Sequence, residues 1–503
     1  MNGGEVINNF KKNVILSFSG QFLIMALGIV VPRIMIDHYG SDVNGLLSTV
    51  TQIFTYMSLL EAGIGQAARN ALYKPIIEHD RQGISYVAST AKRYFHKVTA
   101  FYAVGVIILA GIAPVVLKTE VDYLTVFLVI LLEGMSGVIT FYYIETQMTI
   151  LTADGKAYIN NTVNVVNKTL GYAAKLFMAF LGVNIVFLQF AYFTITILKS
   201  FFYRNYFKKN YGWLNYNIAP KTAKLKDRNA YILTEIAWTI FSSTDMIILS
   251  IFVSTQMSSV YGVYNMIFAN LNVLLNSVYT GVNYVLGQTF HEDKKRYAKL
   301  HDIYTSVFLT GMTVMMCVAY MLIIPFVKLY TRGIDDVNYI NHSLPAMFCL
   351  VQIVSWSRYI AGNLTSVAGY AGQTSRISLI EAGVNIILSV ILVERLGIVG
   401  VLIATVAALP LKVIYCIYLS DRIILKRSYK RTVSILGVNY LLFMTTMCLE
   451  KTMSIEIESF ISLFVWGIIF TFAFAVIGIV LNFGVNQDCI QFAKQLILKN
   501  RKK

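Results

Sequence analysis

Long apolar runs recur along the whole of this 503-residue chain, and short polar connections separate them. A helix needs about 20 predominantly apolar residues to cross the hydrocarbon core of a bilayer. The runs that meet this requirement lie near residues 13–36, 43–65, 95–117, 123–150, 158–181, 183–203, 230–253, 259–287, 302–327, 343–368, 376–394, 397–420, 433–449 and 459–482. The sequence therefore predicts an all-α integral membrane protein with about fourteen transmembrane helices.

The composition is also typical of a membrane protein, and the chain offers little that an enzyme would need. Hydrophobic residues make up 56% of the chain and charged residues only 14%, whereas soluble proteins are about 25% charged. The connections are too short to hold a catalytic domain. The five cysteines and six histidines are scattered without metal-ligand or disulfide spacing. We expect a protein that is not an enzyme and that has neither a bound metal nor a cofactor, apart from a coupling ion.

Positive charge is distributed unevenly among the connections. If the N-terminus is cytoplasmic, the segments "RNYFKKNYGWLNYNIAPKTAKLKDR", "HEDKKRYAKL" and "DRIILKRSYKR" and the tail "KNRKK" face the cytoplasm. Only a few basic residues fall outside, namely Lys118, Lys328, Arg332, Arg395 and Lys451. Such a bias orients helices during insertion. The net charge of +16 is thus a sign of topology, not of nucleic-acid binding. We expect a multi-pass protein of the cytoplasmic membrane with both termini in the cytoplasm.

The two halves of the chain resemble each other at three landmarks. "NGLL" (44–47) and "YGVY" (261–264) are 217 residues apart, "HDRQGI" (79–84) and "EDKKRY" (292–297) are 213 apart, and "LGVNI" (181–185) and "LGIVG" (396–400) are 215 apart. Because six spans is an even number, both halves run in the same direction, as in a parallel repeat. We predict six-helix lobes at 1–225 and 226–425, followed by two additional helices and a basic tail at 426–503.

Several charged residues lie near the ends of predicted spans. Long basic side chains at such positions commonly extend to water, and this reading is favoured for Lys199 and Lys412. Glu145 is read as a polar helix end or a contact between helices. Arg33 follows Pro32 in "GIVVPRIMIDHYG", and two readings stay open for it. It reaches water, or it turns inward and holds an anion.

Other charged residues lie deeper within the spans. Lys168 and Lys175 are seven residues apart and share a helix face, and Arg358 is also in the middle of a span. Glu133 is a candidate partner for one of these cations. A charge inside the bilayer costs about 2.5–3.5 kcal/mol on insertion scales, so it usually faces a partner or a wet cavity. The two readings are an ion pair between helices and a cationic substrate cavity.

The second half carries oxygen-rich side chains within its spans. Asp245 lies in "WTIFSSTDMIILSIF", Glu381 and Asn385 are one turn apart, and Thr405 follows in the next span. Carboxylate, amide and hydroxyl oxygens are suitable ligands for a hard cation or a proton. The alternative is a set of hydrogen bonds between packed helices.

Two stretches resemble a known family. "PRIMIDHYGSDVNGLL" with "LLEAGIGQAARNAL", and "EAGVNIILSVIL" with "LGIVGVLIATVAA", resemble the polysaccharide transporters, or O-antigen-type flippases, of the multidrug/oligosaccharidyl-lipid/polysaccharide exporter superfamily. The resemblance covers nearly all of the chain. It implies two six-helix lobes plus two further helices, and movement of a polyprenyl-diphosphate-linked oligosaccharide from the inner to the outer leaflet by alternating access.

The resemblance also implies roles for particular residues. A diphosphate calls for Arg and Lys, so Arg33, Lys168 and Lys175 become candidate substrate contacts, with Arg358 and Glu133 beside them. A sodium site of related lipid II flippases maps onto Asp245, Glu381, Asn385, Val401 and Thr405, although acid and amide are exchanged in order here. The implied partners are the lipid-linked oligosaccharide, membrane lipids and a polysaccharide polymerase or other assembly proteins. The coupling ion is Na⁺ or H⁺.

Two other functions compete with this one. A cation-coupled drug or metabolite antiporter of the same superfamily is expected to have an acidic first lobe, whereas Arg33, Lys168 and Lys175 outnumber Glu133 here. A membrane polysaccharide polymerase is expected to have a large outward loop, whereas the outward connections near 328–342 and 450–458 are short.

The first testable prediction concerns topology. Reporter fusions after residues 225, 298 and 430 should all report the cytoplasm, because basic connections are retained on that side during insertion. Fusions after residues 118 and 451 serve as the outside controls. An external signal at two of the three cytoplasmic positions would overturn the orientation.

Overall fold

The computed structural model describes residues 3–218, 244–453, 456–492 and 494. The chain divides into two compact units, residues 1–259 and 260–503. Helices form almost all of the described part, which contains no β-strand. The predicted boundary between lobes at residues 225 and 226 lies outside the described residues, as do most of the basic tail and the first half of the predicted span at 230–253.

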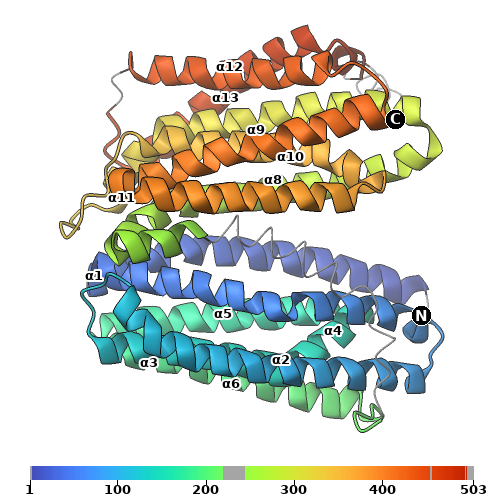
Figure 1. The fold of residues 1–503 in the computed structure, drawn as a ribbon, viewed down its shortest axis with the longest axis vertical. Helices are drawn as coiled ribbons and strands as arrows, with labels where there is room; N and C mark the ends of the chain where they lie inside the picture. Colours follow the sequence, from blue (N-terminus) through green and yellow to red (C-terminus); the bar gives the residue numbers. More distant parts are fainter. Residues whose placement is uncertain (1–2, 219–243, 454–455, 493, 495–503) are drawn as a thin grey trace. The chain divides into compact units, whose positions relative to one another are not determined.

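The first unit is built from long helices that lie roughly side by side (Figure 1). They are α1 (Gly3–Ile77), α2 (Arg81–Val116), α3 (Tyr123–Ile139), α4 (Glu145–Ala153), α5 (Ala157–Phe180) and α6 (Ile185–Asn210), followed by residues 244–252, which are also helical. The π-helical turn η1 (Thr140–Ile144) joins α3 to α4 within one span. Helix α1 packs against α2 and α5, and α3 packs against α2 and α6.

Helix α1 holds two predicted spans, because it is broken at Gly40. The backbone of Gly40 has φ 82° and ψ 168°, a conformation that a residue with a Cβ adopts only with strain. The following segment is tied to the rest of the unit by Asp42. Its carboxylate accepts hydrogen bonds from the Thr119 hydroxyl at 2.7 Å and from the Glu120 amide at 2.8 Å. The break is therefore fixed by neighbouring contacts.

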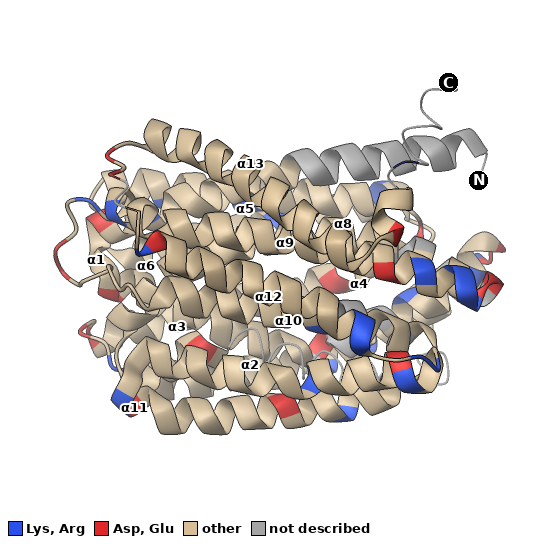
Figure 2. Ribbon diagram, turned by 90° about the horizontal axis from the view of Figure 1, so that it is seen from above, with Lys and Arg blue, Asp and Glu red and all other residues tan. Residues whose placement is uncertain are grey.

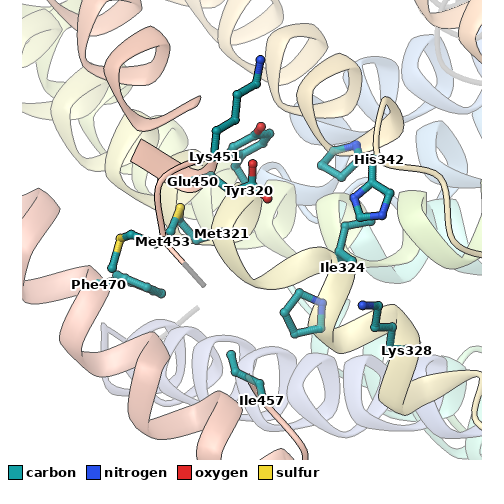
Figure 3. A pocket seen from close by; sticks show the side chains of 12 residues that line it. Tyr320, Met321, Ile324, Lys328, His342, Glu450, Lys451, Met453, Ile457 and Phe470 are labelled. Carbon is teal, nitrogen blue, oxygen red and sulfur yellow. The ribbon is translucent and has the colours of Figure 1, made fainter. Parts of the chain in front are cut away.

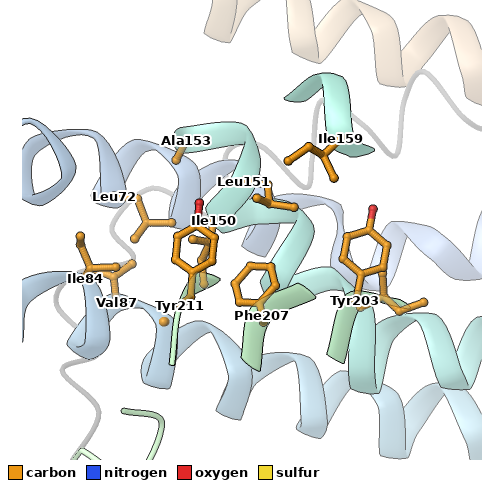
Figure 4. Close-up of a cluster of buried hydrophobic side chains, with 12 residues drawn as sticks. Leu72, Ile84, Val87, Ile150, Leu151, Ala153, Ile159, Tyr203, Phe207 and Tyr211 are labelled. Carbon is orange, nitrogen blue, oxygen red and sulfur yellow. The ribbon is translucent and has the colours of Figure 1, made fainter. Parts of the chain in front are cut away.

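An aromatic and aliphatic cluster closes one end of the first unit (Figure 4). Tyr203, Phe207 and Tyr211 come from α6 and its C-terminal cap, and pack against side chains of α1, α2, α4 and α5. The rings of Phe207 and Tyr211 stack with centroids 4.7 Å apart. Because four other helices meet this cluster, it fixes their ends relative to α6.

The second unit contains the other half of the chain. Its helices are α8 (Thr255–Glu292), α9 (Lys294–Tyr330), α10 (Leu344–Val367), α11 (Ala371–Ile417), α12 (Lys430–Glu450) and α13 (Phe460–Val485). The π-helical segment η3 (Tyr418–Ile424) extends α11. Helix α11 holds two predicted spans and is broken at Gly397, which has φ 54°. Helices α12 and α13 pack on α9 and on each other.

The predicted internal repeat is confirmed by matching local structures in the two units. Asp80 caps α2 and Asp293 caps α9, each accepting hydrogen bonds from backbone amides of the first turn. Gly155 and Gly369 both have positive φ after α4 and α10, and Gly182 and Gly397 both have positive φ before the next span. The spacing within these three pairs is 213, 214 and 215 residues. Equal spacing of special backbone positions shows that the halves fold alike.

The helices have the surface of a protein that lies in lipid. In the described part, nine helices are long and apolar enough to cross a membrane. Two of these helices, α1 and α11, each contain two predicted spans, and the more polar α5 and α8 correspond to two more. These account for thirteen of the fourteen predicted spans, and the first half of the other one, near 230–253, lies outside the described residues. Large apolar side chains are exposed along them, as on α13 with Ile461, Phe464 and Phe472. Charged residues lie mostly toward helix ends (Figure 2). The chain is a multi-pass membrane protein.

A network of ion pairs attaches α12 and α13 to α9. Asp302 on α9 is 3% exposed, and Arg427 binds both its carboxylate oxygens, at 2.6 and 2.8 Å. Arg427 also donates to Asp421 at 2.8 Å. Arg431 on α12 bridges Asp302 at 3.4 Å and Asp488, beyond α13, at 2.5 Å. Because the pairs share members, loss of one partner affects the whole network.

The electrostatics of the network favour its charged form. Partial burial lowers the pKa of Arg427, but its hydrogen bonds and the negative charges of Asp302 and Asp421 outweigh burial and raise that pKa. The hydrogen bond from Arg431 lowers the pKa of Asp488. A carboxyl with a lowered pKa stabilises the fold above its unfolded pKa, and that contribution is lost as pH falls through the folded pKa.

The second prediction concerns this network. Asp302→Ala leaves Arg427 without its bidentate partner, and removal of one partner of a buried pair costs about 3–5 kcal/mol. We expect a clear fall in the unfolding temperature of the detergent-solubilised protein. The exposed Asp335 is the matched control, and Asp335→Ala should leave that temperature unchanged. Adding Arg427→Met should lower it by less than the sum of the two changes, and full additivity would contradict the coupling.

Candidate functional site

Glu133 lies within α3 and contacts α6. The Gln189 side chain, which is 1% exposed, donates a hydrogen bond from Nε2 to Glu133 Oε2. Glu133 itself is half-buried. An acid inside a span needs donors or a positive charge nearby, and Gln189 supplies the donor.

Lys175 of α5 supplies the positive charge. The Lys175 ammonium and the Glu133 carboxylate of α3 attract each other electrostatically. The Lys175 ammonium also lies 5.4 Å from the centroid of the Tyr192 ring, a cation–π distance. The structure therefore brings together two of the predicted site residues, Glu133 and Lys175, and adds Gln189 and Tyr192 from α6, which the sequence did not single out.

Arg33 and Lys168 have different surroundings. Arg33 forms an ion pair with Asp37 at 3.3 Å, one turn later in α1, and its side chain is 28% exposed. Spacing of four residues is the usual one for such a pair on a helix, so this partner could have been found in the sequence. Lys168 is exposed on α5. The predicted substrate-binding roles of Arg33 and Lys168 therefore stay predictions.

A second charged group in the first unit surrounds Glu145, at the start of α4. Lys199 of α6 and Arg69 of α1 attract it electrostatically. Lys199 donates a hydrogen bond to Asn164 Oδ1 at 2.8 Å and is repelled by Lys168. The sequence favoured a solvated Lys199, whereas the structure gives it partners on α4 and α5. Arg69 was missed, because nothing in its local sequence indicates Glu145 as a neighbour.

The corresponding region of the second unit contains a buried ion pair. Arg358 of α10 is 4% exposed and Glu381 of α11 is 2% exposed. One terminal nitrogen of Arg358 lies 3.2 Å from each carboxylate oxygen of Glu381. Lys412, which the sequence also favoured as solvated, attracts Glu381 electrostatically. A predicted substrate contact and a predicted ion ligand are thus partners of one another.

Asn385 and Thr405 meet between the two halves of α11. Asn385 Nδ2 donates to Thr405 Oγ1 at 2.8 Å, and both residues are buried. Asn385 Oδ1 and the hydroxyl of Ser389, one turn further along α11, are buried without a hydrogen-bond partner in the described part. Buried oxygens of this kind commonly bind water or a cation. Among the described residues, no group of three or more His, Cys, Asp and Glu could hold a metal ion.

Asp245 is assigned to the first compact unit, whereas Glu381, Asn385 and Thr405 belong to the second. It is buried next to Thr244, whose hydroxyl is hydrogen-bonded to the Tyr56 hydroxyl of α1. Asp245 also interacts electrostatically with Tyr56.

The charged groups of the two units occupy equivalent positions. Glu145, Lys168 and Lys199 lie on α4, α5 and α6, and Arg358, Glu381 and Lys412 follow each of them by 213 residues. This is the spacing of the two helix caps Asp80 and Asp293. The order of charge differs, being acid, base, base in the first unit and base, acid, base in the second. All three positions are thus charged in both units, and the signs of the first two are exchanged.

Comparison with solved structures assigns the architecture. The lipid II flippase MurJ, in an inward closed conformation, matches with a TM-score of 0.69 and 15% identity over 92% of this chain and 99% of its own. An inward-facing multidrug resistance MATE family transporter of the MOP superfamily matches with a TM-score of 0.63 and 15% identity, over 88% and 99%. The chain has the fold of MOP-superfamily transporters.

A third neighbour is a MOP superfamily transporter from Pyrococcus furiosus, described as having a binding pocket of reverse polarity that suggests a different function. It matches with a TM-score of 0.57 and 14% identity, over 83% of this chain and 97% of its own. No family model matches the chain, and no curated protein matches it in sequence. The fold is therefore assigned by structure, and the transported compound is not.

The third prediction concerns the buried pair of the second unit. Glu381→Gln leaves the Arg358 charge buried without its carboxylate, so the yield and the unfolding temperature of the purified protein should fall. Glu394→Gln removes an exposed acid from the same helix and is the matched control. The double variant Arg358→Met/Glu381→Gln should regain part of the loss, because the buried Arg358 charge is removed as well, while Lys412 still lacks the attraction of Glu381. A double variant less stable than Glu381→Gln would contradict the pairing.

Proposed function

We propose that this protein moves a polyprenyl-diphosphate-linked oligosaccharide from the inner to the outer leaflet of the cytoplasmic membrane, for surface polysaccharide synthesis, by alternating access. The observation that carries the proposal is the excess of basic over acidic side chains within the first unit. Arg69 and Lys199 attract Glu145, Lys175 attracts Glu133, and Lys168 acts on Lys199. A third acid, Glu61, lies near Arg69, so these four cations face three acids. A diphosphate carries the complementary charge.

The surroundings of Lys175 fit a substrate contact. The Lys175 side chain is half-buried, and among the described cations it is the one that attracts Glu133. Its ammonium also lies near the Tyr192 ring. In a partly dry environment, attraction between an ammonium and a phosphate is stronger than in water. Arg33, which has part of its charge balanced by Asp37, adds a planar group that can bind phosphate with two hydrogen bonds.

The alternative is a cation-coupled drug or metabolite antiporter. The MATE neighbours have the same fold, and Glu133 beside Tyr192 could hold an organic cation. The neighbour from Pyrococcus furiosus is a reminder that pocket polarity varies on this fold. The net positive charge around Glu133 and Glu145 favours an anionic compound.

We also propose that Na⁺ or H⁺ drives transport through the second unit. Asn385 Oδ1, Ser389 Oγ and Thr405 Oγ1 are oxygens of the kind that bind Na⁺, and Glu381 is an acid that could exchange a proton. Asp245, which belongs to the first unit, stays a separate candidate for a coupling-ion residue. A polysaccharide polymerase is the assembly protein most suited to receive the exported repeat unit.

The fourth prediction tests the transported compound. In a flippase-null strain, Lys175→Gln should lower surface polysaccharide at least ten-fold at unchanged protein level, and Lys175→Arg should lower it less. Lys209→Gln, which removes an exposed lysine of α6 in the same unit, should export as the unaltered protein does.

A second variant separates binding from structural pairing. If Lys175 only neutralises Glu133, then Glu133→Gln/Lys175→Gln should restore export, since both charges are removed. If Lys175 binds a phosphate, the double variant should stay defective. Restored export would therefore overturn the anion-binding role, and accumulation of organic cations by any of these variants would favour the antiporter.

A further inference from the structure

A pocket of about 290 Å³ lies in the second unit, at the end of the helices where α9 ends and α10 begins (Figure 3). Residues of α12 and α13, with Lys451, Met453 and Ile457 between them, provide the remaining wall. Its lining residues are Tyr320, Met321, Ile324, Pro325, Lys328, His342, Pro345, Glu450, Lys451, Met453, Ile457 and Phe470. Since α12 and α13 follow the duplicated part of the chain, the first unit has no equivalent of this wall.

The inner wall of the pocket is apolar. Met321 of α9 and Phe470 of α13 are buried, and Ile457 and Met453 come from the connection between α12 and α13. The start of α13 also packs on α9, where the Phe326 and Phe460 ring centroids are 6.4 Å apart. Exposed apolar side chains of α13, among them Phe460, Ile461 and Phe464, continue this surface outside the pocket. An acyl chain could follow the surface without leaving apolar contact.

The rim of the pocket is basic. Lys328, His342 and Lys451 are exposed side chains that line it from α9, from the residues before α10 and from the residue after α12. Within the described part of the chain, none of the three forms an ion pair with a carboxylate. The acid in the lining, Glu450, lies beside Tyr320 and interacts electrostatically with it (Figure 3). The rim therefore keeps a net positive charge.

We infer that this pocket binds the phosphate-bearing headgroup of an anionic phospholipid. Lys328 and Lys451 hold the phosphate, and the apolar wall of Met321, Met453 and Phe470 receives the adjoining acyl chains. Basic pockets between transmembrane helices bind anionic headgroups on the cytoplasmic side of membranes, and the same chemistry applies to this pocket. The charge bias of the connections predicts that Lys328 and Lys451 lie on the outer side, so the lipid comes from the outer leaflet. The inference does not depend on which compound the protein transports.

The pocket also gives α12 and α13 a role beyond packing. A lipid held there contacts α9, α10, α12 and α13 at once, at one end of the helices. Outside the pocket, the ion pairs of Asp302, Arg427 and Arg431 join α9, α12 and the segment after α13. The lipid and these ion pairs would together hold α12 and α13 against the other helices of the second unit.

The fifth prediction tests lipid binding with the purified full-length protein. Phosphatidylglycerol should raise its unfolding temperature more than phosphatidylcholine does at equal concentration. Lys328→Gln/Lys451→Gln should weaken the apparent affinity for phosphatidylglycerol at least ten-fold. The matched control is Lys295→Gln/Arg395→Gln, which removes the same charge from exposed positions outside the pocket and should change the affinity less than two-fold.

Further arms identify the ligand. Glu450→Gln should tighten phosphatidylglycerol binding, because it removes the negative charge of the lining. Phe470→Ala should weaken binding of the lipid. Inorganic phosphate should give no comparable stabilisation, since it cannot use the apolar wall. Equal effects of the two lipids, full protection by inorganic phosphate, or equal affinity of the pocket and control variants would each overturn the inference.

Discussion

The structure depends on the cost of placing charge among apolar helices. A carboxylate or ammonium inside a span is tolerated only beside a partner, a donor or water. The deep charges of this protein follow that rule in different ways. Arg358 and Glu381 form a buried pair, and Glu133 receives a hydrogen bond from Gln189 and the charge of Lys175. Each solution ties neighbouring helices together, so the positions of α3, α5 and α6, and of α10 and α11, follow from it.

Duplication explains where these charges lie, but not their sign. The groups around Glu145 and Arg358 are on equivalent helices at one spacing, and in both units the basic residue of the last helix, Lys199 or Lys412, is kept. Exchange of acid and base between the first two helices preserves attraction within each unit. It changes which helix presents a carboxylate. A parallel repeat can thus conserve its packing while its two halves acquire different affinities for ions.

The sequence predicts the fold class and the repeat well, because both depend on local patterns. Apolar length determines the spans, and capping residues and glycines such as Asp80 and Gly397 mark their ends. Partnerships between distant helices are not local. Arg358 and Glu381 were both singled out, yet for different roles, since nothing within one span shows which side chain faces it. The pairing of Arg33 with Asp37 could have been predicted, because the two residues are one helical turn apart. Arg69 and Asp302 interact with charged residues that are distant in the sequence, so only the packing of the helices shows their roles.

A fold shared by a lipid II flippase and by multidrug transporters cannot by itself decide what is carried. Polarity inside the units is the feature that distinguishes an anionic from a cationic cargo. In the first unit, Glu133 is attracted to Lys175, and Glu145 to Lys199 and Arg69. Part of the charge of these cations is thus balanced, and under the proposed function a phosphate would have to compete for it. Under the proposed function, such competition would have a consequence for transport. A diphosphate that draws Lys175 away from Glu133 would weaken the electrostatic attraction between α5 and α3, so binding and helix movement would be coupled through the same side chain.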